Sequence, residues 1–300
     1  MKQFLILLGL SLTLLTTIGC HQGEKATRTL REGGSMPFHG PLPRGPVPTY
    51  QQLVSLHNSR LERIPQISAQ AQIEIIYFDT KGKRHFEQAD QCRLMFIRPR
   101  QMALLVRKFG VGDLFYAGSN NEHYWLFDLT NKDSRLLYQG RHDGDSSQAM
   151  RRLPVPVQPR DLPRLMGLAE LPSEGEGSVA AVKGGYLVTA ATQDWRILID
   201  PASKLPIRVE LLDNQQRVTM TSLLSVQGQV ETYERAPSAW PKLMTRIMIV
   251  PHHSKDVLTV YLSPIDDGRE FDTIQGRAFD LERLTRVYKP DEVILLDQPE

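Results

Sequence analysis

Hydrophobic positions recur at helical spacing just before the first long run of alternating residues. Thr49 and Gln52 have the three-residue spacing of a capping box, and Leu53 begins an apolar series that stops at Pro65. Proline cannot continue a helical hydrogen-bond ladder, so it marks the end of such a series. The pattern therefore predicts a helix over residues 50–64.

From residue 68 the hydrophobic period changes to two, which is the period of a β-strand. Turn signals such as Gly110-Val111-Gly112 separate successive runs, and short connections of this kind favour antiparallel neighbours. The predicted strands cover residues 68–78, 84–98, 101–109, 113–118, 123–129, 134–138, 186–191, 195–200, 207–212, 218–226, 245–250, 257–262 and 293–296.

Two further short helices are predicted between and after these strands. Asp161 is a candidate N-cap with Pro163 in the first turn, and an apolar cluster follows before Pro172. The members of this cluster are Leu162, Leu165, Met166 and Leu168. The spacing of Leu281, Leu284 and Val287 indicates a third helix near the end of the chain.

The central strands are apolar on both faces, as in Leu104-Leu105-Val106 and Trp125-Leu126-Phe127. Neither face can be left to water, so something must cover both. We expect the short helices to cap one concave face, while the other face packs on itself or on a partner. A loosely capped curved sheet leaves an apolar cavity, whereas a filled β-sandwich core leaves none, and the sequence allows both.

The first twenty residues have the pattern of a secretory signal peptide. Lys2 is followed by an apolar run from Phe4 to Leu15, which is shorter than the roughly 20 residues that span a bilayer. The segment Thr17-Ile18-Gly19-Cys20 resembles the lipobox of bacterial lipoproteins, which implies cleavage after residue 19 and acylation of Cys20. An ordinary signal peptide with a chance cysteine is the alternative.

Residues 20–48 are rich in glycine and proline and have Phe38 as their single aromatic residue. Such a segment cannot bury enough surface to offset its ordering entropy, so we predict a flexible tether after residue 20. His21 follows the cysteine. The absence of aspartate at this position favours the outer membrane, facing the periplasm, by analogy with enterobacterial sorting.

Composition narrows the remaining classes. The 300 residues are 41% hydrophobic and 23% charged, which is enough to bury a large core. The formal net charge is +2 with dispersed signs, so no nucleic-acid partner is indicated. Two cysteines cannot build a disulfide framework, and Cys92 is predicted to be a buried core residue. The folded part is predicted to be a monomer.

No catalytic residue, metal site or cofactor is predicted, because the chain lacks the common hydrolase, metalloprotease and phosphate-loop motifs. His252-His253 could ligate a metal together with acids near His142, but adjacent histidines on an extended chain point to opposite faces. A turn between strands is the simpler interpretation. We therefore expect a binding or structural protein, not an enzyme.

The lipobox, the helix at residues 53–64 and the long antiparallel strands together resemble the lipoprotein-localisation (LolA/LolB-like) carrier and receptor superfamily. The resemblance covers about residues 50–226. It implies an α+β, mainly β fold, in which a curved antiparallel sheet forms an incomplete barrel capped by two or three short helices. The cavity of such a fold would hold acyl chains. Residues 153–172 resemble the receptor's lid helix, which implies that Leu162, Leu165, Met166 and Leu168 contact the ligand.

The same resemblance places Phe109 and Val111 at a protruding tip that would meet a membrane or a partner. Residues 49–300 would then form one half-barrel domain, with a C-terminal extension from about residue 230. The predicted function is an envelope lipoprotein that binds acyl chains or lipoprotein cargo, with a periplasmic carrier as a candidate partner. The alternative is a structural or interaction lipoprotein with a packed core and no ligand.

Overall fold

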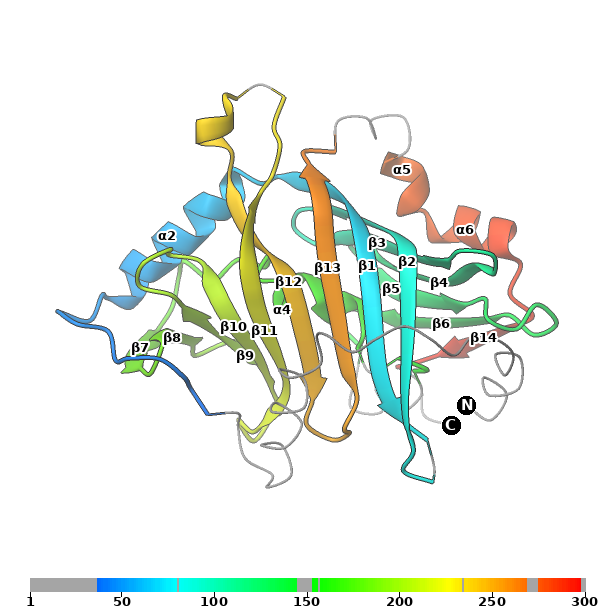
Figure 1. The fold of residues 1–300 in the computed structure, drawn as a ribbon, viewed down its shortest axis with the longest axis horizontal. Helices are drawn as coiled ribbons and strands as arrows, with labels where there is room; N and C mark the ends of the chain where they lie inside the picture. Colours follow the sequence, from blue (N-terminus) through cyan, green and yellow to red (C-terminus); the bar gives the residue numbers. More distant parts are fainter. Residues whose placement is uncertain are drawn as a thin grey trace, which may run out of the picture. The chain divides into compact units, whose positions relative to one another are not determined.

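Within residues 37–79, 81–144, 153–155, 157–233, 235–268 and 275–297, which the computed structural model describes, 14 strands form one curved sheet (Figure 1). Contacts group Phe38–Glu300 into one compact unit. The predicted signal peptide, Cys20 and the first part of the predicted tether lie outside the described residues. The mainly β fold with a curved, largely antiparallel sheet and a few short helices is confirmed.

The sheet consists of two meanders that meet at its centre. Its strand order is β14-β6-β5-β4-β3-β2-β1-β13-β12-β11-β10-β9-β8-β7, so β14 and β7 form the two edges and the sheet stays open. The first meander contains β1 (Gln66–Phe78), β2 (Arg84–Ile97), β3 (Gln101–Lys108), β4 (Gly112–Ser119), β5 (His123–Asp128) and β6 (Leu136–Arg141). The second contains β7 (Gly177–Val182), β8 (Gly185–Ala190), β9 (Trp195–Ile199), β10 (Pro206–Leu212), β11 (Val218–Gln229), β12 (Lys242–Pro251) and β13 (Val257–Asp266).

The residues after 230 are part of the sheet's centre. β12 pairs with β11, and β13 pairs antiparallel with β1, so these two strands join the meanders. The last strand, β14 (Glu292–Leu295), pairs with β6 in parallel. The short connections between the other strands predict antiparallel pairing. The predicted C-terminal extension therefore supplies both a central and an edge element.

The first helix begins as its sequence predicts. α2 covers Tyr50–Glu62, and the Thr49 hydroxyl accepts a hydrogen bond from the Gln52 amide while the Gln52 side chain accepts one from the Thr49 amide. This reciprocal capping satisfies two N–H groups at the helix start. Upstream of α2, the Pro41 carbonyl accepts a hydrogen bond from the Gly184 amide, and the Phe38 ring lies 4.5 Å from the Arg208 guanidinium carbon. The end of the predicted tether thus contacts the sheet.

Both faces of the first meander are covered, as the apolar pattern of its strands requires. Directly opposite residues share a face, and Leu104, Ala117 and Leu126 are buried on the side of α2 and the predicted lid. We call this side the lid face. Their neighbours Tyr116 and Phe127 are buried on the opposite side, which we call the α6 face.

Two C-terminal helices cover the α6 face, namely α5 (Gln275–Ala278) and α6 (Leu281–Tyr288). The expectation that this face packs on itself or on a partner is therefore wrong. The Tyr116 hydroxyl donates to the Ala278 carbonyl at 2.7 Å, and the Phe127 and Tyr288 ring centroids are 5.2 Å apart. These contacts fix the C-terminal residues to strands that lie far away in the sequence.

Candidate functional site

A short lid segment crosses the lid face between the two meanders. It contains the 3₁₀ turn η2 (Pro159–Asp161) and the helix α4 (Leu162–Leu165). Pro159 is the first residue of η2 and Pro163 the second of α4, positions in the first turn where the missing N–H of proline is not needed. Gly167 has φ +68, and a Cβ there would come 2.7 Å from the Pro206 side chain, so glycine is required where the lid turns away from α4. The predicted second helix is therefore present but shorter than its apolar pattern indicates.

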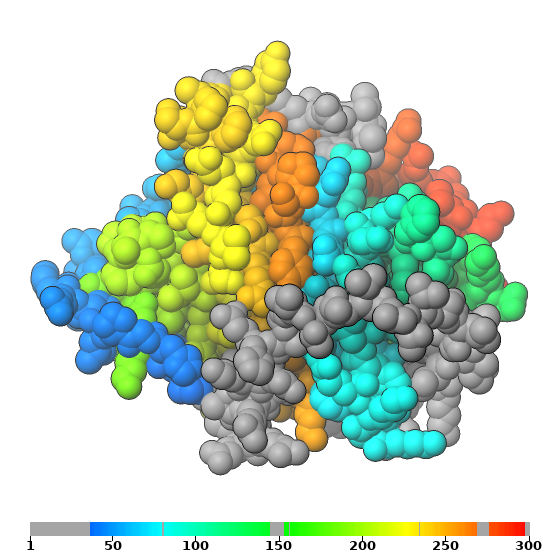
Figure 2. Space-filling model, in the orientation of Figure 1, coloured from blue at the N-terminus to red at the C-terminus, as the bar shows by residue number. Residues whose placement is uncertain are grey.

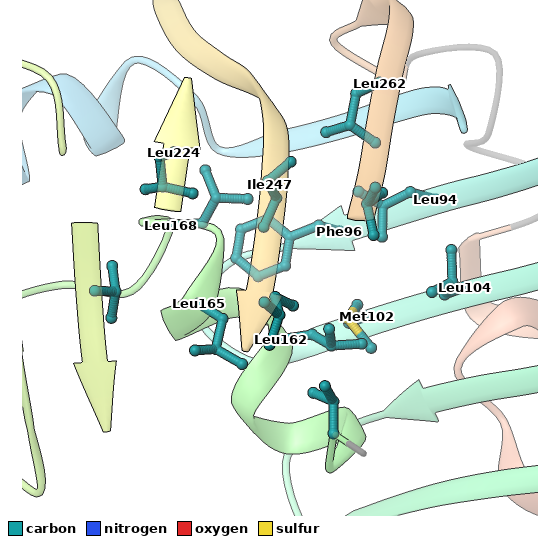
Figure 3. Close-up of a cluster of buried hydrophobic side chains, with 14 of the residues drawn as sticks. Leu94, Phe96, Met102, Leu104, Leu162, Leu165, Leu168, Leu224, Ile247 and Leu262 are labelled. Carbon is teal, nitrogen blue, oxygen red and sulfur yellow. The ribbon is translucent and has the colours of Figure 1, made fainter. Parts of the chain in front are cut away.

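The predicted lid residues lie together in the interior (Figure 3). Leu165 is fully buried, Leu162 and Leu168 are almost so, and Met166 is half-buried against the same cluster. Their neighbours in this cluster include Phe96 and Met102 from the first meander and Leu224 and Ile247 from the second. The lid side chains thus connect apolar residues of both halves of the sheet.

Polar side chains of α2 hold the chain that follows α4. The Asn58 amide donates to the Leu171 carbonyl at 2.7 Å and accepts from the Leu171 amide at 3.0 Å. Arg60 donates to the Gly167 carbonyl at 2.7 Å, and the Tyr50 hydroxyl donates to the Pro172 carbonyl at 3.0 Å. We call these contacts, with the one made by His57, the lid latch.

His57 completes the lid latch as a neutral side chain. Its Nε2 lies 2.9 Å from the Ala169 carbonyl, so Nε2 must carry the proton. Burial, with a further contribution from the nearby Arg60 charge, lowers the pKa of His57 to about 3. Burial also lowers the pKa of Arg60 to about 10, which leaves its guanidinium charged at neutral pH. The lid latch therefore contains one partly buried cation that donates to a main-chain carbonyl.

Ion pairs hold the flanks of the lid segment. Arg164 donates to both carboxylate oxygens of Asp194 at 3.0 Å, and its Nη1 lies 3.7 Å from Asp161. Burial raises the pKa of Asp161, and the charge of Arg164 opposes this effect. Farther along, Glu170 pairs with Arg98 at the end of β2. Polar contacts thus surround the apolar lid residues.

Two features of the packing bear on ligand binding, namely a small cavity away from the lid and the burial of the lid leucines. A cavity of about 10 Å³ lies where Gln66, Ile67 and Phe96 approach Phe279, which is room for about one water molecule. Lipid sites are typically several hundred cubic ångströms. The lid leucines are themselves buried against both meanders, so a ligand could take their place on the sheet only if the lid moved.

The predicted tip lies in the turn between β3 and β4, apart from the lid cluster. Gly110 has φ +75 and Gly112 has φ +107, so the chain reverses sharply around Val111. Phe109 is 76% exposed and Val111 is 50% exposed. The sequence left open whether Phe109 is buried or exposed, and the structure places it in solvent. An Arg107–Asp113 ion pair at 2.6 Å closes the base of the turn.

The other chemical candidates occupy structural positions. Cys92 is buried, and burial raises the pKa of its thiol to about 11. His252 lies in the turn after β12 and is 2.9 Å from the Thr221 hydroxyl. Among the described residues, no group of His, Cys, Asp and Glu could hold a metal ion. Within the same residues, no helix is both long and apolar enough to cross a bilayer.

The sequence interpretation missed the polar half of the site. It placed His57 and Arg60 within the first helix but gave them no role. A histidine and an arginine on the apolar side of a helix were the available signal, because buried polar groups need partners. Their partners lie about 110 residues away in the chain, at Gly167 and Ala169.

Comparisons with known proteins find similar solved structures but no matching sequence family. No protein-family model and no curated protein sequence matches the chain. Similar solved structures include a DUF1329 family protein from Desulfovibrio piger, with 13% identity, TM-score 0.46 and coverage of 72% of this chain and 91% of that one. A putative outer membrane lipoprotein-sorting protein domain from Vibrio parahaemolyticus has 12% identity and TM-score 0.45, over 72% and 92% of the two chains.

A LolA superfamily protein from Nitrosomonas europaea is also similar, with 12% identity, TM-score 0.43 and coverage of 73% of this chain and 93% of that one. The superfamily that the sequence resembles is thus represented among the structural neighbours. These are similarities at low identity.

Proposed function

We propose that the protein is an envelope lipoprotein that is anchored through Cys20 and binds acyl chains, or another apolar ligand, between the lid and the sheet. In this proposal it takes lipid or lipoprotein cargo from a periplasmic carrier and delivers it to the outer membrane. Its function is binding and transfer. The observation that carries the proposal is the lid itself, which is apolar toward the sheet and is held by a small set of polar contacts.

The lid latch is suited to a segment that opens. Each neutral hydrogen bond contributes about 1 kcal/mol net, because water replaces it when it breaks. The Asn58 and Tyr50 contacts can be exchanged for water in this way without unfolding a strand. Opening would expose Leu162, Leu165 and Leu168, and an acyl chain could then cover the same apolar surface.

A second candidate function rests on the packing of the interior. Leu165 is fully buried among side chains of both meanders, which suits a structural or interaction lipoprotein with no ligand. The two candidates differ in whether the lid ever leaves the sheet.

Binding of a fluorescent fatty-acid probe distinguishes the two candidates. The protein should bind the probe stoichiometrically, and Leu165→Asp should weaken binding at least tenfold, because an unpaired carboxylate is poorly tolerated beside an acyl chain. Leu56→Asp is the matched control, since Leu56 is 38% exposed on α2. Absence of probe binding by the folded wild-type protein, or equal affinity in wild type and Leu165→Asp, would favour the packed structural protein.

Anchoring is tested separately from ligand binding. Cys20→Ser removes the thiol that lipobox processing would acylate, so metabolic labelling with palmitate should be lost and the protein should leave the membrane fraction or stay unprocessed. Cys92→Ala should keep its label, because Cys92 is buried in the sheet. Normal labelling of Cys20→Ser would contradict the assigned anchor.

A further inference from the structure

The C-terminal helix α6 has one face fixed to the sheet and one face in solvent. Asp280 caps its start by accepting a hydrogen bond from the Arg283 amide at 3.0 Å. Leu284 is buried on the α6 face, and the Tyr288 ring lies 5.5 Å from the Tyr116 ring and 5.2 Å from that of Phe127. The helix is therefore rigidly oriented, and its opposite side is presented to solvent in a fixed way.

The solvent side of α6 combines cations with an apolar side chain. Arg286 and Lys289 are exposed, and Val287 between them is 58% exposed. Across the described part of the chain, neither cation makes an ion pair, in contrast to Arg107 and Lys108 in the neighbouring strand. The acidic residue Glu282 lies in the first turn and Arg286 in the last, so the two cations lie at the C-terminal end of the helix, where the exposed acids Asp291 and Glu292 follow in the chain.

This end of α6 lies beside the β3–β4 turn. Asp113 and Arg107, which close the base of that turn, are close enough to Tyr288 to perturb its ionisation, and burial together with Asp113 raises the pKa of Tyr288 to about 12. Figure 2 shows α6, in red, next to the teal-green residues of this turn. The exposed Phe109 and Val111 therefore share one end of the sheet with Val287 and the two cations.

We propose that α6 and the β3–β4 turn together form a surface that docks on an anionic lipid bilayer. Three exposed apolar side chains can enter the headgroup boundary, while Arg286 and Lys289 meet lipid phosphates. Each cation near an anionic surface strengthens binding about fivefold, so the pair contributes on the order of 25-fold. This inference rests on the proposed function. It adds that the membrane that receives the cargo has an anionic surface.

Flotation of the purified full chain, prepared without acyl groups on Cys20, with two kinds of vesicle tests the surface. The measured quantity is the ratio of its partition to phosphatidylcholine vesicles containing phosphatidylglycerol over its partition to phosphatidylcholine alone. Arg286→Gln with Lys289→Asn should lower this ratio about 25-fold. Asparagine suits position 289, where φ is 49°. The control is Arg44→Gln with Lys183→Gln, which removes two exposed cations elsewhere and should leave the ratio unchanged.

Each outcome decides the proposal. A wild-type ratio near one would overturn it and would leave a protein partner as the occupant of this surface. An equal fall in the control would also overturn it, because general net charge would then explain the preference. Uptake of the fatty-acid probe should be the same in both double variants. The wild-type protein could take up no probe and still partition preferentially to anionic vesicles, with only the α6 double variant losing that preference. This result would reject the proposed cavity and support the docking surface.

Discussion

The lid on one face of the sheet and the α5–α6 pair on the other are both short, but polar contacts have a larger part in holding the lid. Besides its buried leucines, the lid is attached by side-chain to main-chain hydrogen bonds from Asn58, Arg60 and Tyr50. The α5–α6 pair is attached by aromatic packing of Tyr116, Phe127 and Tyr288. When a cover opens, such hydrogen bonds are replaced by hydrogen bonds to water. Exposing a buried aromatic ring to water costs free energy that no new contact offsets. The difference indicates which cover can open while the sheet stays folded.

Local opening has a lower free energy than global unfolding where contacts are few and polar. The lid segment meets this description at its latch, although its leucines are buried. The contacts on the α6 face are mainly apolar, because Phe127 and Trp125 are completely buried in its cluster. Substitutions on the two faces should therefore act on two different equilibria.

The largest effect is expected on the α6 face. Phe127→Ala should lower the free energy of unfolding by about 3 to 5 kcal/mol, because it removes a fully buried ring and leaves a cavity. Denaturant titration measures this loss. Phe86→Ala is the control, since Phe86 is 50% exposed, and it should cost much less. A loss below about 1 kcal/mol for Phe127→Ala would show that α5 and α6 are not a fixed part of the fold.

A smaller and local effect is expected at the lid latch. Asn58→Ala removes both hydrogen bonds to Leu171, which should ease lid opening by about 2 kcal/mol. Hydrogen exchange of the Leu171 amide should speed up about 30-fold, as this free energy implies. Amides of the central strands should keep their wild-type rates, and uptake of the fatty-acid probe should become faster.

Asn121→Ala is the matched control, because Asn121 is exposed in the turn before β5. It should change neither rate. If Asn58→Ala instead speeds exchange equally in the lid and in the central strands, the lid and the sheet open only together, and the contrast between the two faces is lost.

Local signals made much of the fold predictable. The capping box of Thr49 and Gln52 and the period-two runs depend on near neighbours, so the first helix and most strands follow from them. β7 was missed because Gly177-Ser178-Val179-Ala180-Ala181-Val182 consists of small residues with no polar alternation. The pairing of β13 with β1 was also beyond prediction, since it joins residues that are almost 200 positions apart.

The candidate site divides in the same way. The apolar lid residues could be found because Leu162, Leu165 and Leu168 recur at helical spacing within one short segment. The partners of His57 and Arg60 in the lid latch could not, because they are main-chain carbonyls, and every residue has one. The sequence also could not place Phe109, because strand alternation allowed burial and the flanking glycines allowed exposure.

The smallest effect on stability is expected at that tip. Phe109 is 76% exposed, so Phe109→Ala should change the free energy of unfolding by no more than about 0.5 kcal/mol and leave the melting temperature nearly constant. Delivery of a lipidated cargo to liposomes should nevertheless fall, because the ring would no longer enter the acyl-chain boundary. Phe86→Ala makes the same change at a half-exposed position on β2 and should leave delivery intact. A large drop in melting temperature for Phe109→Ala, with delivery unchanged per folded molecule, would show that Phe109 stabilises the fold and has no role in delivery.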